Sequence, residues 1–134
     1  MAANRYMVLA TADEAGVPWS TPVWFATEDH RRFFWISDPN ARHSRNIAAR
    51  PEIAIVIFDS SVTPGDAAAV YMRAHAEEVP PSELGVFASE SARQGLRDMT
   101  EADVTPPAKH RLYRATATEH WTLDERDERI PQGI

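Results

Sequence analysis

The stretch WSTPVWFATEDHRRFFWISDPNARHSRNIAARP, from Trp19 to Pro51, decides the fold. Two runs rich in aromatic and β-branched residues, WSTPVWFAT and RRFFWIS, flank the short polar segment from Glu28 to His30. Strand formers bounded by turn residues are the strongest local signal for a β-hairpin. We therefore expect two strands here, joined by a tight turn.

A basic helix is predicted to follow these strands directly. Asp38 is a good N-cap residue and Pro39 suits the first helical position, so the helix is predicted to begin there. Arg42, His43 and Arg45 then fall in its first two turns, where free backbone N–H groups and the helix dipole favour an anion. The pattern predicts a phosphate-binding site.

Further strands are predicted on both sides of this stretch. Apolar or alternating runs place them at Tyr6 to Ala12, Glu52 to Asp59, Ala67 to Val79 and Leu112 to Leu123. Helical spacing from Ser82 to about Arg97 predicts helices before the last strand. The six strands predict a mainly β fold, a six-stranded antiparallel barrel with helical additions, in a single domain over residues 1–134.

The faces of two strands carry further expectations. Neither face of the strand from Trp19 to Thr27 is polar, so we expect the core to cover one face and a ligand or partner to cover the other. Regular alternation along the last strand places Trp121 on the same face as Tyr113 and Ala117. The charged tail DERDERIPQGI is expected to be solvated.

Composition and charge exclude several classes of function. The chain has 134 residues, with 14 basic and 20 acidic side chains and a net charge of −6, which argues against nucleic acid or an anionic membrane as the main partner. The lack of cysteine excludes disulfides, thiolate metal sites and a cysteine nucleophile. The histidines lack metal-ligand spacing, so no metal site is predicted. With no spanning apolar run and no signal-peptide pattern, a cytoplasmic location is expected.

The text from VLATADEAGVPW to EIAIVIFD resembles the pyridoxamine 5'-phosphate oxidase-like family of flavin-binding split barrels, which includes relatives that use a deazaflavin coenzyme. The resemblance runs from about Tyr6 to Leu123 and rests on the mutual spacing of the Pro22 segment, the F-x-x-S segment and the basic helix. It implies an FMN-binding split barrel that forms a homodimer with the cofactor at the subunit interface. It further implies an FMN-dependent oxidoreductase that transfers hydride to or from an unidentified small molecule. A deazaflavin-dependent reductase and a non-catalytic flavin- or haem-binding module remain open alternatives.

The resemblance also implies a set of cofactor-binding residues. These are Thr21, Pro22, Val23, Trp24 and Phe25 along the second strand, Ile36 and Ser37 at the end of the third, Arg42, His43 and Arg45 on the basic helix, and Trp121. No acid or base is assigned, because a flavin supplies the hydride chemistry itself. Without the resemblance, Arg42 and Arg45 are the solvated face of a helix, and Trp19 and Trp35 belong to the core or to a dimer interface.

The chain departs at several positions from the true pyridoxamine phosphate oxidases of the family. Thr21 and Ala26 stand where those oxidases carry an arginine and a lysine, and His43 replaces the lysine of the phosphate pair. The C-terminal tail also lacks the Arg-Leu-His-Asp-Arg sequence of those enzymes. We therefore expect a different substrate.

Overall fold

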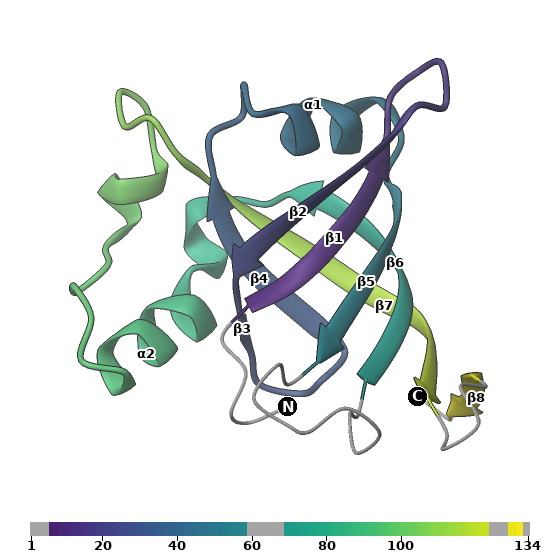
Figure 1. Ribbon diagram of the computed structural model, residues 1–134. Helices are drawn as coiled ribbons and strands as arrows, with labels where there is room; N and C mark the ends of the chain where they lie inside the picture. Colours follow the sequence, from purple (N-terminus) through teal and green to yellow (C-terminus); the bar gives the residue numbers. More distant parts are fainter. Residues whose placement is uncertain (1–5, 59–68, 124–128, 133–134) are drawn as a thin grey trace.

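The computed structural model describes residues 6–58, 69–123 and 129–132, and it shows an antiparallel sheet curled into a barrel with helices at one end and on one side (Figure 1). The strands are β1 (Tyr6–Ala12), β2 (Pro18–Trp24), β3 (Ala26–Thr27), β4 (Arg32–Ser37), β5 (Glu52–Phe58), β6 (Ala69–Glu78), β7 (Arg111–Leu123) and β8 (Arg129–Gln132). The helices are α1 (Arg42–Ala49), α2 (Gly85–Arg93) and the short 3-10 turns η1 (Pro81–Glu83) and η2 (Glu101–Val104). The predicted mainly β barrel with helical additions is confirmed.

The strand order is β2-β1-β5-β6-β7-β4-β3, and β8 pairs with β7. The end strands β2 and β3 follow one another in the chain and are separated by Phe25, so the chain itself joins the two ends of the curled sheet. The strand predicted from Trp19 to Thr27 is therefore divided in two. This division and β8 account for the difference between the six strands predicted and the eight found.

The main core fills the barrel with side chains that alternate along each strand. Ile53, Ile55 and Ile57 of β5 are buried, whereas Ala54 between them is exposed. Trp35 is fully buried and stacks on Tyr113 of the neighbouring β7, with ring centroids 5.8 Å apart. The strongest apolar run of the sequence thus lies at the centre of the sheet, between β1 and β6.

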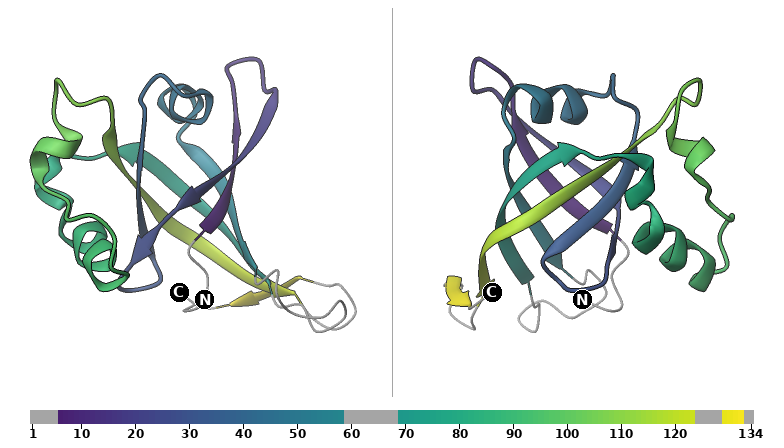
Figure 2. Two further views of the ribbon diagram at one scale, coloured as in Figure 1. Left: turned by 60° about the vertical axis from the view of Figure 1, so that its left-hand side comes forward. Right: turned by 180° about the vertical axis from the view of Figure 1, so that it is seen from behind.

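A second, smaller core holds α2 against β3 and β4, and both 3-10 turns against β7 (Figure 2). Its members are Ala26, Phe34, Val79, Leu84, Phe87, Val104 and Leu112. The helix predicted from Ser82 to Arg97 ends at Arg93, just before Gly95, whose φ of 72° is the left-handed conformation that glycine adopts freely. The helical additions are therefore packed parts of the fold.

The predicted face of Trp121 is wrong because β7 contains a bulge. Glu119 pairs with Arg73 and Ala117 pairs with Ala74, so Thr118 is one extra residue in the β7 strand. Beyond it His120 lies opposite the buried Met72, and Trp121 points to the outside of the barrel. Tyr113 and Ala117, before the bulge, point inward and are buried.

Within the tail, residues 129–132 form β8, which pairs with the end of β7. Residues 124–128 and 133–134 lie outside the described part of the chain. Within the described residues, no helix is long and apolar enough to cross a membrane.

Candidate functional site

Helix α1 lies across one end of the barrel, beside the turn between β1 and β2 (Figure 1). It begins at Arg42 rather than at Pro39, and its N-cap Ala41 makes no side-chain hydrogen bond, so the predicted capping role of Asp38 is wrong. The Asp38 carboxylate instead accepts the backbone N–H of Asn40 at 2.8 Å, and its carbonyl accepts that of Ala41 at 3.0 Å. This local turn delays the helix and leaves Arg42 and His43 in its first turn.

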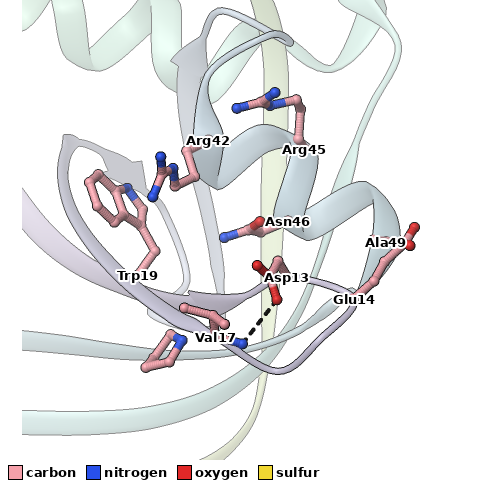
Figure 3. Close-up of a pocket in the computed structure, with 9 residues that line it drawn as sticks. Asp13, Glu14, Val17, Trp19, Arg42, Arg45, Asn46 and Ala49 are labelled. Atoms are coloured by element: carbon pink, nitrogen blue, oxygen red, sulfur yellow. Dashed lines mark hydrogen bonds between the residues drawn. The ribbon is translucent and has the colours of Figure 1, made fainter.

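A pocket of about 420 Å³ lies between α1 and the β1–β2 turn (Figure 3). Its lining residues are Asp13, Glu14, Val17, Pro18, Trp19, Arg42, Arg45, Asn46 and Ala49. The four helical members stand at positions i, i+3, i+4 and i+7, so one face of α1 forms a whole wall of the pocket. The turn and the start of β2 form the facing wall.

Two arginines give the helical wall its positive charge. The guanidinium carbon of Arg42 lies 4.3 Å from the centroid of the Trp19 ring, a cation–π contact that fixes the direction of the side chain. Neither Arg42 nor Arg45 forms a salt bridge within the described ranges of the chain, and the first turn of α1 contains no acidic residue. Both charges are therefore available to an anion from solution.

Hydrogen bonds hold the two walls together. The side-chain amide of Asn46 donates to Thr11 Oγ1 at 3.1 Å, and both residues are buried. At the other end of the helix, Arg50 donates to the carbonyl oxygen of Glu14 at 2.9 Å. The turn is itself ordered by Asp13, whose Oδ1 accepts the N–H groups of Ala15 and Val17, each at 2.9 Å. The pocket is thus preformed without a ligand.

Ser37 and His43 are joined beside this pocket. His43 Nε2 lies 2.8 Å from Ser37 Oγ, within hydrogen-bonding distance. Burial lowers the pKa of His43 below its ordinary value of 6.5, so the imidazole is neutral at pH 7 in the ligand-free chain. His43 therefore differs in charge from the lysine that the family carries.

The remaining strand residues of the predicted site are divided between the two sides of the barrel wall. Val23 and Phe25 are buried in the main core, which leaves their backbone as the part that a ligand can reach. Trp24 packs edge-on against Phe87 of α2, with ring centroids 5.1 Å apart. Thr21 is half-buried, whereas Pro22 is exposed on the outer face.

Ile36 and Trp121 lie apart from the pocket. Ile36 is half-buried and packs against the second core. Trp121 lies at one end of a row of cross-strand neighbours on the outer face of the sheet. In order across the strands, the row is Pro22, Val8, Val56, Tyr71 and Trp121. Within one chain the structure brings together Arg42, Arg45 and the Ser37–His43 pair, and it does not bring Trp121 to them.

Of the nine residues that line the pocket, Arg42 and Arg45 were predicted from the sequence and seven were missed. Asn46 had a signal, because it follows Arg42 by four positions and so shares its helical face. Trp19, Asp13 and Glu14 enter the pocket through the packing of the β1–β2 turn against α1, which no local pattern encodes.

The fold and the pocket define a small antiparallel barrel with a preformed pocket between α1 and the β1–β2 turn, in which two arginines face two acidic residues. The family model described as pyridoxamine 5'-phosphate oxidase matches residues 1–124, so this chain belongs to that family. A search of curated proteins found no match.

Solved structures share the fold at low sequence identity. The heme storage protein HutZ from Vibrio cholerae is 21% identical, with a TM-score of 0.68, over 87% of this chain and 84% of that one. An F420 reductase is also 21% identical, with a TM-score of 0.64, over 86% and 87% of the two chains. A 5-nitroimidazole antibiotic resistance protein from Bacteroides thetaiotaomicron is 12% identical, with a TM-score of 0.70, over 90% and 76%. These neighbours share the barrel and differ in what they bind.

Proposed function

We propose that this chain is an FMN-dependent oxidoreductase that binds the flavin phosphate at Arg42 and Arg45 and works as a homodimer. The observation that carries the proposal is the pair of arginines on the first two turns of α1 that form no salt bridge with any described residue, in a pocket whose walls are already bonded together. The substrate is a small molecule other than pyridoxamine phosphate.

The chemistry of the donor set fits a phosphate. Guanidinium groups bind phosphate oxygens through charge-assisted hydrogen bonds, and the contact with Trp19 directs the Arg42 group before the ligand arrives. The first intrahelical bond of α1 runs from Arg45 N to Ala41 O at 3.0 Å, so the N–H groups ahead of it have no helical partner. Together these groups supply charge and directed donors at one place.

The outer face of the sheet fits a flavin ring and a second copy of the chain. The row from Pro22 to Trp121 is mostly apolar, and the large side chains Tyr6 and Phe58 are 62% and 47% exposed on the same face. A second copy packed on this face removes the apolar surface from water and encloses a ring laid on β2. A bound flavin supplies hydride transfer itself, and the residues of this chain orient it and exclude water.

A deazaflavin-dependent reductase is the second candidate, because the same arginines suit its phosphate and the fold is shared with an F420 reductase. A haem-binding module is the third candidate, because the fold is shared with the heme storage protein HutZ.

A titration with FMN and with riboflavin tests the proposal, since the two differ only in the phosphate. We expect FMN to bind about ten- to a hundredfold more tightly, which is the worth of one or two charge-assisted hydrogen bonds. Equal affinities would show that no phosphate site is used. Titration with the deazaflavin coenzyme in the same buffer ranks the second candidate.

A further inference from the structure

We infer that two acidic residues on the turn side of the pocket, Asp13 and Glu14, make this chain prefer a cofactor that ends at its phosphate. A cofactor that continues past its phosphate into an acidic tail is disfavoured. The inference rests on the proposed function, because it takes the cofactor phosphate to lie at Arg42. It adds a reason for the choice between the two candidate cofactors.

The pocket extends well beyond the place proposed for the phosphate. It follows the face of α1 from Arg42 through Arg45 and Asn46 to Ala49. Figure 3 shows Trp19 beside Arg42 at one end of the pocket and Glu14 beside Ala49 at the other. A ligand that continues past its phosphate into this pocket therefore passes between Arg45 and the β1–β2 turn.

The β1–β2 turn presents two carboxylates to that path. Asp13 and Glu14 both line the pocket, and neither forms a salt bridge in the parts of the chain that the structure describes. The nearby Arg50 donates a hydrogen bond to the backbone carbonyl oxygen of Glu14 rather than to its carboxylate. Two negative charges thus face the positive charge of Arg45 across the far part of the pocket.

This arrangement treats the two candidate cofactors differently. FMN ends in a single phosphate, which meets Arg42 and needs no further room. The deazaflavin coenzyme continues beyond its phosphate with several carboxylates, and Asp13 and Glu14 repel these charges. The far part of the pocket thus opposes an acidic tail.

Removing the two negative charges tests the inference. In the variant Asp13→Asn with Glu14→Gln, the Asn side-chain oxygen still accepts the bonds that order the turn. The matched control is Glu28→Gln, which removes an exposed acid from the β3–β4 turn and leaves this pocket intact. The probes are FMN, the deazaflavin with its glutamate tail and the same deazaflavin without glutamates, each titrated at low and high salt.

We expect the double variant to bind the tailed deazaflavin about three- to tenfold more tightly than the wild type, with less gain at high salt. Its affinities for FMN and for the tail-free deazaflavin should change less than about twofold, and Glu28→Gln should change none of the three. If the flavins bind but the double variant gains nothing for the tailed form, the inference is wrong and the proposed function stands. If the wild type binds no flavin, both fail together.

Discussion

His43 is the residue whose chemistry the fold alters most clearly. Burial holds the pKa of its imidazole below the ordinary 6.5, and Nε2 lies 2.8 Å from Ser37 Oγ. The folded chain therefore binds a proton at this site less readily than the unfolded chain does. The corresponding stabilisation is fully present above about pH 6.5 and is lost as the pH falls through the lowered pKa.

Urea denaturation checks this expectation. We expect the free energy of unfolding to decrease between about pH 7.5 and pH 5, and to decrease less in His43→Gln. Part of the dependence of unfolding free energy on pH should remain in this variant, because burial also lowers the pKa of His120. The exposed His75 provides a control in His75→Gln. A His43→Gln variant as sensitive to acid as the wild type would contradict the neutral, buried imidazole.

Single residues of the site were predictable only where local spacing places them. Arg42, Arg45 and Asn46 share a helical face, and that periodicity is visible in the sequence. Trp19, Asp13 and Glu14 join the pocket because the β1–β2 turn packs against α1. The turn and the helix are more than twenty residues apart in the sequence. Contacts of this kind depend on the closed barrel rather than on local sequence.

Helix α2 shows what single elements contribute to the barrel. Phe87 is buried in the second core and meets Trp24 edge-on, so the outer side of β2 near Trp24 is covered by protein. We expect Phe87→Ala to lower the free energy of unfolding by about 3 kcal/mol, as large-to-small core substitutions do. Flavin affinity, measured well below the unfolding transition, should stay unchanged.

The comparison with Trp24→Leu then separates two roles of Trp24. If Trp24 mainly holds α2, that variant loses stability and keeps the wild-type flavin affinity. A stable variant with weaker FMN binding would instead support the contact with the ring that the family resemblance implies.

Element types were predictable, and their exact starts and faces were less so. Alternation and apolar runs identified the strands, because burial on a pleated sheet follows side-chain direction. The bulge at Thr118 carries no residue signal, and the single extra residue turned Trp121 to the other face. At α1, the Asp38 turn competed with helix capping and moved the start to Arg42.

At the scale of the whole molecule, the outer face of β2, β1, β5, β6 and β7 is the proposed dimer interface. Val56 lies at its centre, between Val8 and Tyr71 in register. We expect light scattering at micromolar concentration to give the mass of two chains for the wild type and of one chain for Val56→Glu. Ala92→Glu, at an exposed position on α2, should remain a dimer. If the wild type is a monomer, the proposal that a second copy encloses the flavin ring is wrong as well.

The order of strands around the barrel was not predictable from local patterns. β4 pairs with β7, although the two lie more than seventy residues apart in the sequence, and β5 inserts between β1 and β6. Such pairings follow from closing one continuous core, which local periodicity does not encode.

Titration of Arg42→Ala with FMN, beside Arg31→Ala, tests the central claim most directly. Arg31 is an exposed arginine in the β3–β4 turn, so it controls for the loss of one positive charge. We expect Arg42→Ala to bind FMN about ten- to a hundredfold more weakly than the wild type, with an unchanged fold, because a charge-assisted hydrogen bond to phosphate is lost. Arg31→Ala should bind as the wild type does. If the two variants titrate alike, Arg42 is only part of a solvated surface, and the proposed cofactor site is wrong.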